Sequence, residues 1–304
     1  MPYLVADSLS RKYGHNLALD DFSLSVNKGE LFALLGPDGA GKTTMIRVLC
    51  RLLDPDSGSV TINGLDLQQR YDDIKPILGY MPQQFSLYPD LSVEENMTFY
   101  AGMYGVTGQA YRDKRDQLYQ FSKLGPFAKR RASALSGGMK QKLALSCALI
   151  HNPRMLILDE PTTGVDPLSR RQFWETLLQL KSQGVTILVS TPYMDEVARC
   201  DRAAFIFGGR KLAEDRPAQL AAAFQGSIFY IDREPTSQLL NQIMSIDGLT
   251  TARFGAGMHL YLAPDDSLDP YLNALSQLGL NSSDINPIAP SLEDRFIQLM
   301  ESPT

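Results

Sequence analysis

Residues 31–43 read LFALLGPDGAGKT, an apolar run followed by a glycine-rich loop that ends in lysine and threonine. The loop, Gly36–Thr43, fits the pattern G-x-x-x-x-G-K-[ST], and apolar residues recur at helical intervals after it, over Thr43–Leu53. In a strand, loop and helix of this order, successive backbone amides and the positive end of the helix dipole point at one anion. We therefore predict a nucleotide phosphate site in which Lys42 reaches the β- and γ-phosphates and Thr43 holds Mg²⁺. A glycine-rich turn that only caps a helix is the less favoured alternative. The other predicted contacts of the nucleotide are Gly36, Pro37, Asp38, Gly39, Ala40, Gly41 and Thr44.

Two adjacent carboxylates, Asp159 and Glu160, end a second apolar run, Met155–Leu158. Ligands of open α/β sheets bind at the carboxyl ends of the strands, so we expect both carboxylates near the phosphate loop. Asp159 is predicted to join the Mg²⁺ sphere, and Glu160 to act as general base toward the attacking water. Alone, such a pair is more often a solvated turn. Beside a phosphate loop, the functional interpretation is favoured.

A serine and two glycines begin a further predicted helix, in the segment LSGGMKQ at residues 135–141. The Ser136 hydroxyl, the amides and the helix dipole all point at one anion. The segment resembles the signature of the ABC (ATP-binding cassette) ATPases, and no other P-loop class known to us carries it. The resemblance implies that Ser136, Gly137 and Gly138 contact the γ-phosphate of an ATP bound by a facing nucleotide-binding domain. By itself, the segment is equally well a capped helix with a flexible start.

Other segments that resemble the family follow in the order that it requires, over residues 3–215. The resemblance implies that Tyr13 stacks on adenine and that Gln83, after Met81 and Pro82, links Mg²⁺ and the attacking water to a membrane partner. In the segment PTTGVDP at residues 161–167, Asp166 is expected to reach across the dimer. Without the family context, Tyr13 would be a core residue and the other two segments ordinary turns.

One position departs from the family pattern. Where the family usually has T-H-x-M-D-E, residues 191–196 read TPYMDE, so Pro192 replaces the switch histidine. Proline has neither a side-chain donor nor an N–H, and loss of one preorganised donor typically costs about 10²–10³ in rate. His15, His151 and His259 all lie away from this strand end in the sequence. We therefore hypothesise firm ATP binding with slow hydrolysis. Asp38, where asparagine is commoner, is a milder departure.

Strands that alternate with helices predict an α/β fold with a mostly parallel sheet covered on both faces. The resemblance adds an antiparallel β subdomain and identifies the cassette as residues 1–216. Residues 85–135 are predicted to be a helical insertion, in which Ser92 and Glu95 have capping-box spacing. The Met and aromatic residues after them are interpreted as core, with docking as the less favoured alternative. The exposed face of the insertion is the candidate docking site. Residues 217–304 are predicted to be a small separate α+β domain of βαββα type.

Composition limits the remaining possibilities. A net charge of −5 and a pI near 5.3 disfavour nucleic-acid binding. Cys50, Cys147 and Cys200 are far apart in apolar segments, which predicts reduced core thiols rather than disulfides or a metal site. The sequence contains neither a basic-then-apolar leader nor an apolar run near the ~18 residues that span a bilayer. We expect a cytoplasmic location on the inner membrane, with the spans supplied by another chain.

The segment SLEDRF at residues 291–296 and the overall pattern resemble the ABC-2 type exporter ATPases. The resemblance implies ATP, Mg²⁺, an ABC-2 type permease and a second nucleotide-binding domain as partners. That second domain belongs either to a copy of this chain or to a related chain with a complete site. Two alternatives stay open: an ABC ATPase acting on ribosomes or DNA, and a small-molecule kinase with a P-loop. The first usually has paired cassettes and basic surfaces, and the second leaves the signature unexplained.

Overall fold

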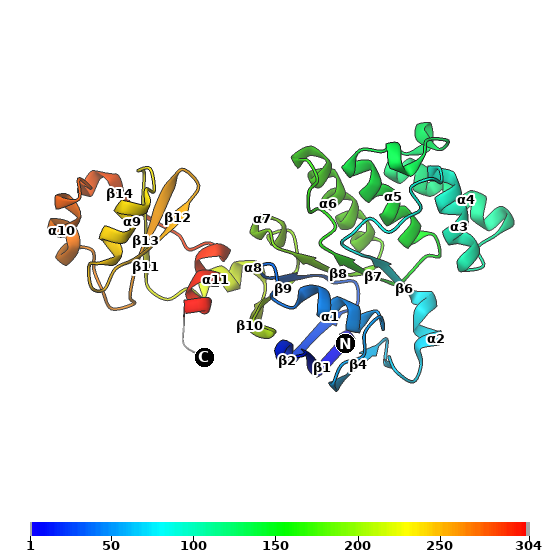
Figure 1. Ribbon diagram of the computed structural model, residues 1–304, viewed down its shortest axis with the longest axis horizontal. Coiled ribbons are helices and arrows are strands. Elements are labelled where there is room, and N and C mark those ends of the chain that lie inside the picture. The colour runs from blue at the N-terminus through cyan, green and yellow to red at the C-terminus, as the bar shows by residue number, and fades with distance from the viewer. Residues whose placement is uncertain (1, 302–304) are drawn as a thin grey trace. The chain divides into compact units, whose positions relative to one another are not determined.

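The computed structural model describes residues 2–301, and the chain divides into two compact units, Met1–Pro217 and Ala218–Thr304. The first unit is built on a six-stranded sheet with the order β10-β9-β3-β8-β7-β6 (Figure 1). Five strands pair in parallel, and β10 pairs antiparallel with β9. The strands are β3 (Leu31–Leu35), β6 (Leu78–Met81), β7 (Met155–Asp159), β8 (Thr186–Thr191), β9 (Arg202–Phe207) and β10 (Arg210–Asp215).

Every residue of β3, β7 and β8 is buried. Such burial is expected of parallel strands in a sheet that is covered on both faces. The helix α1 (Lys42–Leu49) lies on one side of the sheet, and α5 (Gly137–Leu149) and α6 (Pro167–Ser182) lie on the other (Figure 1). The predicted α/β fold with a mostly parallel sheet is confirmed.

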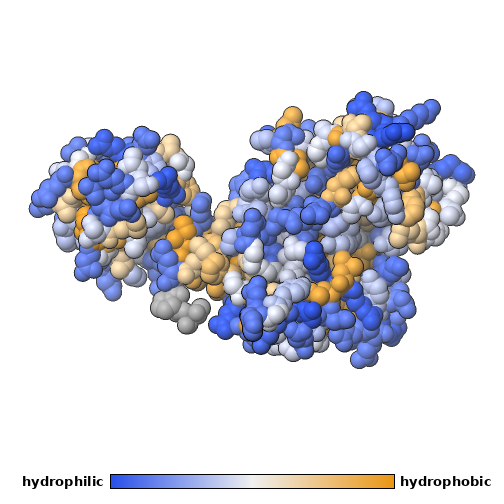
Figure 2. Space-filling model, viewed as in Figure 1, coloured by the Kyte–Doolittle hydropathy of each residue, from blue (hydrophilic) through white to orange (hydrophobic). Residues whose placement is uncertain are grey.

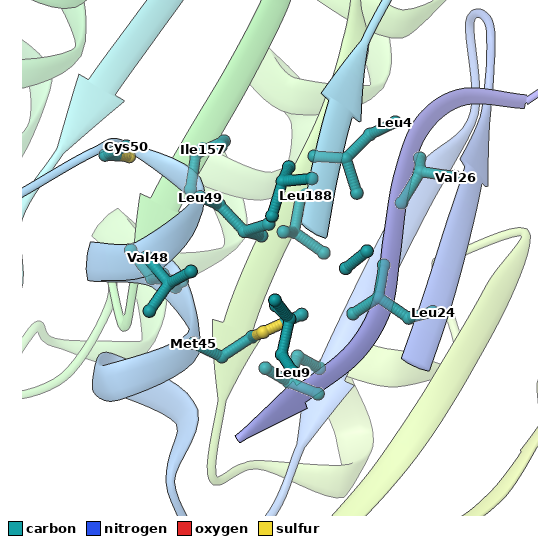
Figure 3. Close-up of a cluster of buried hydrophobic side chains, with 14 of the residues drawn as sticks. Leu4, Leu9, Leu24, Val26, Met45, Val48, Leu49, Cys50, Ile157 and Leu188 are labelled. Carbon is teal, nitrogen blue, oxygen red and sulfur yellow. The ribbon is translucent and has the colours of Figure 1, made fainter. Parts of the chain in front are cut away.

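A second, antiparallel sheet with the order β2-β1-β4-β5 covers the outer side of α1. Its strands are β1 (Pro2–Tyr13), β2 (Asn16–Asn27), β4 (Ser57–Ile62) and β5 (Leu65–Asp66). Figure 3 shows Met45 and Leu49 of α1 in one cluster of buried side chains with Leu9 and Leu24 of this sheet and Leu188 of the six-stranded sheet. Each fully buried aliphatic side chain contributes about 1.5–3 kcal/mol. The helix that follows the glycine-rich loop is therefore anchored on two sides.

Residues 82–154, all described, contain helices and no strand. The capping box is confirmed, because Glu95 N donates to Ser92 Oγ (3.2 Å) and Ser92 N donates to Glu95 Oε2 (2.7 Å). Met97 and Ala101 are buried, which agrees with the core interpretation of this stripe. The helices and helical turns of the first unit that remain are α2 (Tyr71–Ile74), η1 (Lys75–Ile77), α3 (Val93–Met103), α4 (Gly108–Ser122), η2 (Gly125–Phe127), η3 (Ala132–Ala134) and α7 (Met194–Val197).

The predicted core thiols are confirmed, since all three cysteines are buried and free. Among residues 2–301, no helix has the length and the apolar character needed to cross a membrane. The face shown in Figure 2 is mostly hydrophilic, with hydrophobic residues in small groups.

The second unit contains an antiparallel sheet with the order β12-β13-β11-β14. The chain order is strand, helix, strand, strand, helix, strand, which is the split βαβ arrangement of ferredoxin-like folds. The elements are α8 (Pro217–Ala222, at the boundary), β11 (Ser227–Ile231), α9 (Ser237–Met244), β12 (Thr250–Phe254), β13 (Gly257–Leu262), η4 (Asp269–Tyr271), α10 (Leu272–Gln277), η5 (Ser282–Asp284), β14 (Ile285–Ile288) and α11 (Leu292–Glu301). The βαββα prediction was wrong in omitting β14. That strand is short and contains Pro287, which a sheet tolerates at an edge where no N–H is needed.

A buried hydrogen-bond network attaches α11 to β13. The Asp294 carboxylate accepts hydrogen bonds from Tyr261 Oη (2.8 Å) and from the backbone N–H of Ser291 (2.7 Å), and it lies 2.7 Å from His259 Nδ1. Burial acts to raise the pKa of Asp294, but the hydrogen bonds from Ser291, His259 and Tyr261 outweigh it and hold the pKa below its ordinary value of 3.8. The carboxylate is therefore charged and paired at neutral pH.

Asp294→Asn is expected to destabilise the second unit by about 1–3 kcal/mol at neutral pH, because buried hydrogen-bond partners lose a charged acceptor. A carboxylate whose pKa is lower in the folded than in the unfolded state stabilises the fold fully at pH values above the unfolded pKa. This stabilisation is lost as the pH falls through the folded pKa. The difference between wild type and variant should therefore shrink below pH 3.8. Amide hydrogen exchange of β13 measures this difference in stability, and the exposed Asp265→Asn variant is the control. A difference that stays constant down to low pH would contradict the assignment.

Candidate functional site

The glycine-rich loop joins β3 to α1 in a space that only glycine fits. A methyl group at Gly36 would collide with the carbonyl oxygen of Ile206, and one at Gly41 with that of Ala18. Gly41 also has φ of 109°, a conformation that L side chains rarely adopt. It is the N-cap of α1, and in the described residues 2–301 no side-chain hydrogen bond caps this helix. The amides of that turn are therefore free of a capping side chain, as an anion site requires.

Lys42 is buried and fully partnered. Its ammonium donates to the carbonyl oxygens of Gly36 (2.7 Å) and Pro37 (2.9 Å), and Nζ lies 2.9 Å from Oε1 of Glu160. Both charged side chains are nearly inaccessible, at 3% and 4% exposure. The structure thus brings together the lysine of the loop and the second carboxylate of β7, as predicted from strand-end position.

The two carboxylates at the end of β7 are held by neighbouring strands. Ser190, at the end of β8, donates to Asp159 Oδ1 (2.8 Å) and accepts from the backbone N–H of Glu160 (3.0 Å). Glu160 has φ of 45°. Gln83 Nε2 donates to Glu160 Oε2 (2.9 Å), and Thr43 Oγ1 donates to Asp159 Oδ1 (3.3 Å). Burial raises the pKa of Asp159 despite the hydrogen bonds from Ser190 and Thr43.

These groups border a cavity of about 370 Å³. Tyr13, 44% exposed, contributes an aromatic side chain to its wall. The lining residues are Tyr13, Asn16, Ala18, Asp38, Gly39, Gly41, Lys42, Thr43, Thr44, Gln83 and Glu160. Gly36, Pro37, Ala40 and Asp159 support this wall from behind, through the loop backbone and the contact between Thr43 and Asp159. Asn16 and Ala18 were missed, because long-range contacts through Gly209 connect that hairpin to the loop: Asp20 N donates to Gly209 O, and Gly209 N donates to Ala40 O.

Ser136, Gly137, Gly138 and Asp166 do not line this cavity. They form a second cluster at the starts of α5 and α6. Ser136 Oγ accepts from Met139 N (3.4 Å), and Asp166 Oδ1 accepts from Ser169 N (2.9 Å), so both residues are N-caps. The hydrogen bonds from Ser169 hold the pKa of the exposed Asp166 below its usual range. A methyl group at Gly138 would collide with Ser169, which shows how closely the two helix starts approach.

The turn after β8 is organised by a buried carboxylate that the sequence analysis did not identify. Thr191 Oγ1 and Thr162 Oγ1 both donate to Glu196, which is 1% exposed. Thr191 Oγ1 also accepts from the backbone N–H of Tyr193 (3.0 Å). Pro192 stands between these two residues. The sequence signal for Glu196 is weak, since it rests only on a carboxylate four residues after a proline that ends a strand.

The residues at the cavity fit a magnesium ion by donor chemistry. Thr43, Asp159 and Gln83 offer a hydroxyl, a carboxylate and an amide oxygen, the hard ligands that Mg²⁺ prefers. Within residues 2–301 no three His, Cys, Asp or Glu side chains form a metal-binding group. One carboxylate with added phosphate oxygens is a common protein contribution to Mg²⁺.

The fold and this cavity define a P-loop nucleotide-binding protein. The family model described as ABC transporter matches residues 19–163. The chain is 39% identical over 286 residues to the probable multidrug ABC transporter ATP-binding protein YbhF of Escherichia coli (strain K12), covering 93% of this chain and 49% of that protein. It is 36% identical over 293 residues to the Nod factor export ATP-binding protein I of Burkholderia orbicola (strain AU 1054), covering 96% and 95%.

Solved structures similar to this chain are also ATP-binding proteins of ABC transporters. An ATP-binding subunit of an ABC transporter has a TM-score of 0.66 and 31% identity, covering 72% of this chain and 92% of that one. A dimeric, post-hydrolysis ATP-binding cassette with ADP and Pi has a TM-score of 0.64 and 26% identity, covering 70% and 98%. The chain belongs to the ABC transporter family, as an ATP-binding protein. It spans about half the length of the Escherichia coli relative.

Gly36→Ala is expected to lower the stability of the first unit by about 1–3 kcal/mol, because the added methyl group forces the loop away from β9. Gly102→Ala is the control, since a methyl group there on α3 meets nothing within 4 Å. Thermal unfolding of both variants and wild type measures the effect. Equal melting temperatures for the two variants would show that the loop yields without cost.

Proposed function

We propose that this chain binds and hydrolyses ATP and drives export through a separate membrane permease. The observation that carries the proposal is Glu160, which directly follows β7 and has Lys42 on one carboxylate oxygen and Gln83 on the other. A carboxylate so held beside a phosphate loop suits a general base that orients water. Export is supported by the names of the two relatives, which describe multidrug transport and Nod factor export.

The mechanism assigns each residue one task. The loop Gly36–Thr43 and Thr44 hold the phosphates, and Lys42 neutralises the β- and γ-oxygens. Tyr13 stacks on the base. Magnesium, held by Thr43, Asp159 and Gln83, would neutralise charge on the phosphate oxygens. Glu160 accepts the proton of the attacking water, and Gln83 positions that water because its amide already contacts the same carboxylate.

A second nucleotide-binding domain completes the site. Ser136, Gly137 and Gly138 begin α5 beside Asp166, away from the cavity of their own chain. The positive end of the α5 dipole suits the γ-phosphate of a facing subunit, and Asp166 lies beside it to cross the same interface. ATP would then close the pair, and hydrolysis would reopen it. The partner is either a second copy or a related chain with a complete site.

The membrane partner is proposed to be an ABC-2 type permease that docks on the helical insertion. Tyr88, Phe99 and Met103 are exposed there at 46%, 41% and 59%, and the rings of Tyr88 and Phe99 meet at 4.7 Å. This exposed group lies just beyond Gln83 in the sequence, which gives a short route from the cavity to the surface. The chain would sit on the cytoplasmic face of the inner membrane. No described observation favours a role on ribosomes or DNA, and the net charge opposes one.

Glu160→Gln tests the general base. The change keeps the size of the side chain but removes the proton acceptor, so ATP turnover should fall by about 10²–10⁴. ATP affinity should stay within a few fold. Steady-state phosphate release and nucleotide titration measure the two quantities on the full chain. Glu175→Gln, on the exposed surface of α6, is the matched control. Turnover within about twofold of wild type would assign the proton transfer to another group.

Pro192→His tests the slow-hydrolysis hypothesis. An imidazole at this position restores a donor toward the γ-phosphate, so turnover should rise by at least about tenfold, a conservative part of the usual 10²–10³ effect. Tyr193→His, one residue further, is the matched control and should bring no such gain. The comparison uses phosphate release at saturating ATP. Equal rates for wild type and Pro192→His would show that Pro192 does not slow hydrolysis.

A further inference from the structure

A cavity of about 640 Å³ lies in the second unit, where β13 ends and β12 begins. Volumes of this order are typical of sites for small organic ligands. The segment before β11, the connection from α9 to β12 and the helix α11 surround it. From α11 the cavity receives Asp294, Ile297, Gln298 and Glu301, whose spacing of three, four and seven residues puts them on one helix face.

The walls of the cavity are largely apolar and partly aromatic. Phe224, Met244, Ile246 and Leu262 contribute side chains to them. Phe224 and Tyr261 lie with ring centroids 5.9 Å apart at an angle of 39°. Met244 is 51% exposed although it is large and apolar. This combination favours a ligand with a substantial apolar body.

The charged groups at the cavity are all acidic. Asp247, Asp294 and Glu301 line it, and no Lys, Arg or His is among its lining residues in the described part of the chain. Within residues 2–301, neither Asp247 nor Glu301 has an ion-pair partner. Burial, the hydrogen bond to Asp294 and the negative charges of Asp294, Glu293 and Glu301 raise the pKa of Tyr261.

We propose that this cavity binds an amphipathic organic cation, with its apolar body against the walls and its positive charge between Asp247 and Glu301. Carboxylates attract the cation directly, and the aromatic side chains of Phe224 and Tyr261, which line the cavity, add a favourable contact. An anion of the same shape would meet only like charge, which discriminates strongly against it. The site is separate from the nucleotide cavity, since the two share no residue.

Two probes of nearly the same shape and opposite charge test the proposal. Isothermal titration calorimetry on the full chain should show one tetraphenylphosphonium bound per chain, and no binding of tetraphenylborate. Saturating ATP should leave the stoichiometry unchanged. Amide exchange of α11 should slow when tetraphenylphosphonium is present, because the ligand covers that helix. Binding of neither probe, equal binding of both, or unchanged exchange of α11 would overturn the proposal.

The carboxylates are tested by Asp247→Asn combined with Glu301→Gln, both at exposed positions where neutral isosteres leave the fold intact. Affinity for tetraphenylphosphonium should fall by about tenfold or more, since the charge attraction is lost while the apolar walls remain. Glu234→Gln removes an exposed charge of the same unit outside the cavity and should bind like wild type. Equal affinity of the double variant and wild type would locate the cation elsewhere and contradict the proposal.

Discussion

The buried contact between Lys42 and Glu160 joins the two halves of the nucleotide cavity. An ammonium group has three donors, and here they meet Gly36 O, Pro37 O and Glu160. Two charges removed from water are tolerated only when such partners are present. Removal of one partner from a buried pair typically costs about 3–5 kcal/mol, because the other charge is left uncompensated. The contact therefore links the loop after β3 to the residue that follows β7.

The strand between these two segments determines how they meet. β8 lies between β3 and β7, and its register places Ser190 opposite Asp159 and Thr191 opposite Leu35. A small hydroxyl at that point bridges the Asp159 carboxylate and the Glu160 amide. A large apolar side chain in place of Ser190 would separate the carboxylates from the loop. The chemistry at the edge of the sheet thus depends on one short polar residue near the end of β8.

The features predicted correctly from the sequence are those that depend on local sequence pattern. The strand Leu31–Leu35, the capping box at Ser92 and the loop glycines follow from apolar runs, spacing and backbone freedom, and the alternation of strands and helices gave the sheet class. Ser190, Glu196 and Asn16 escaped prediction because their partners lie across neighbouring strands or turns. Strand register is needed to find them, and no short segment contains it. The strand β14 escaped because its Asn and Pro are typical of loops, although an edge strand tolerates both.

The turn around Pro192 is held by its neighbours. Proline cannot donate a backbone hydrogen bond, but the turn is held on both sides of it, by Thr191 Oγ1 on the Tyr193 amide and by Glu196 on Thr191. The guanidinium of Arg170 also lies over the Tyr193 ring, 4.8 Å from its centroid. Because Glu196 binds Thr162 as well, the same carboxylate connects this turn to the segment that leads to Asp166. With proline at position 192, Glu196 therefore still connects the turn after β8 to the segment that leads to the proposed dimer face.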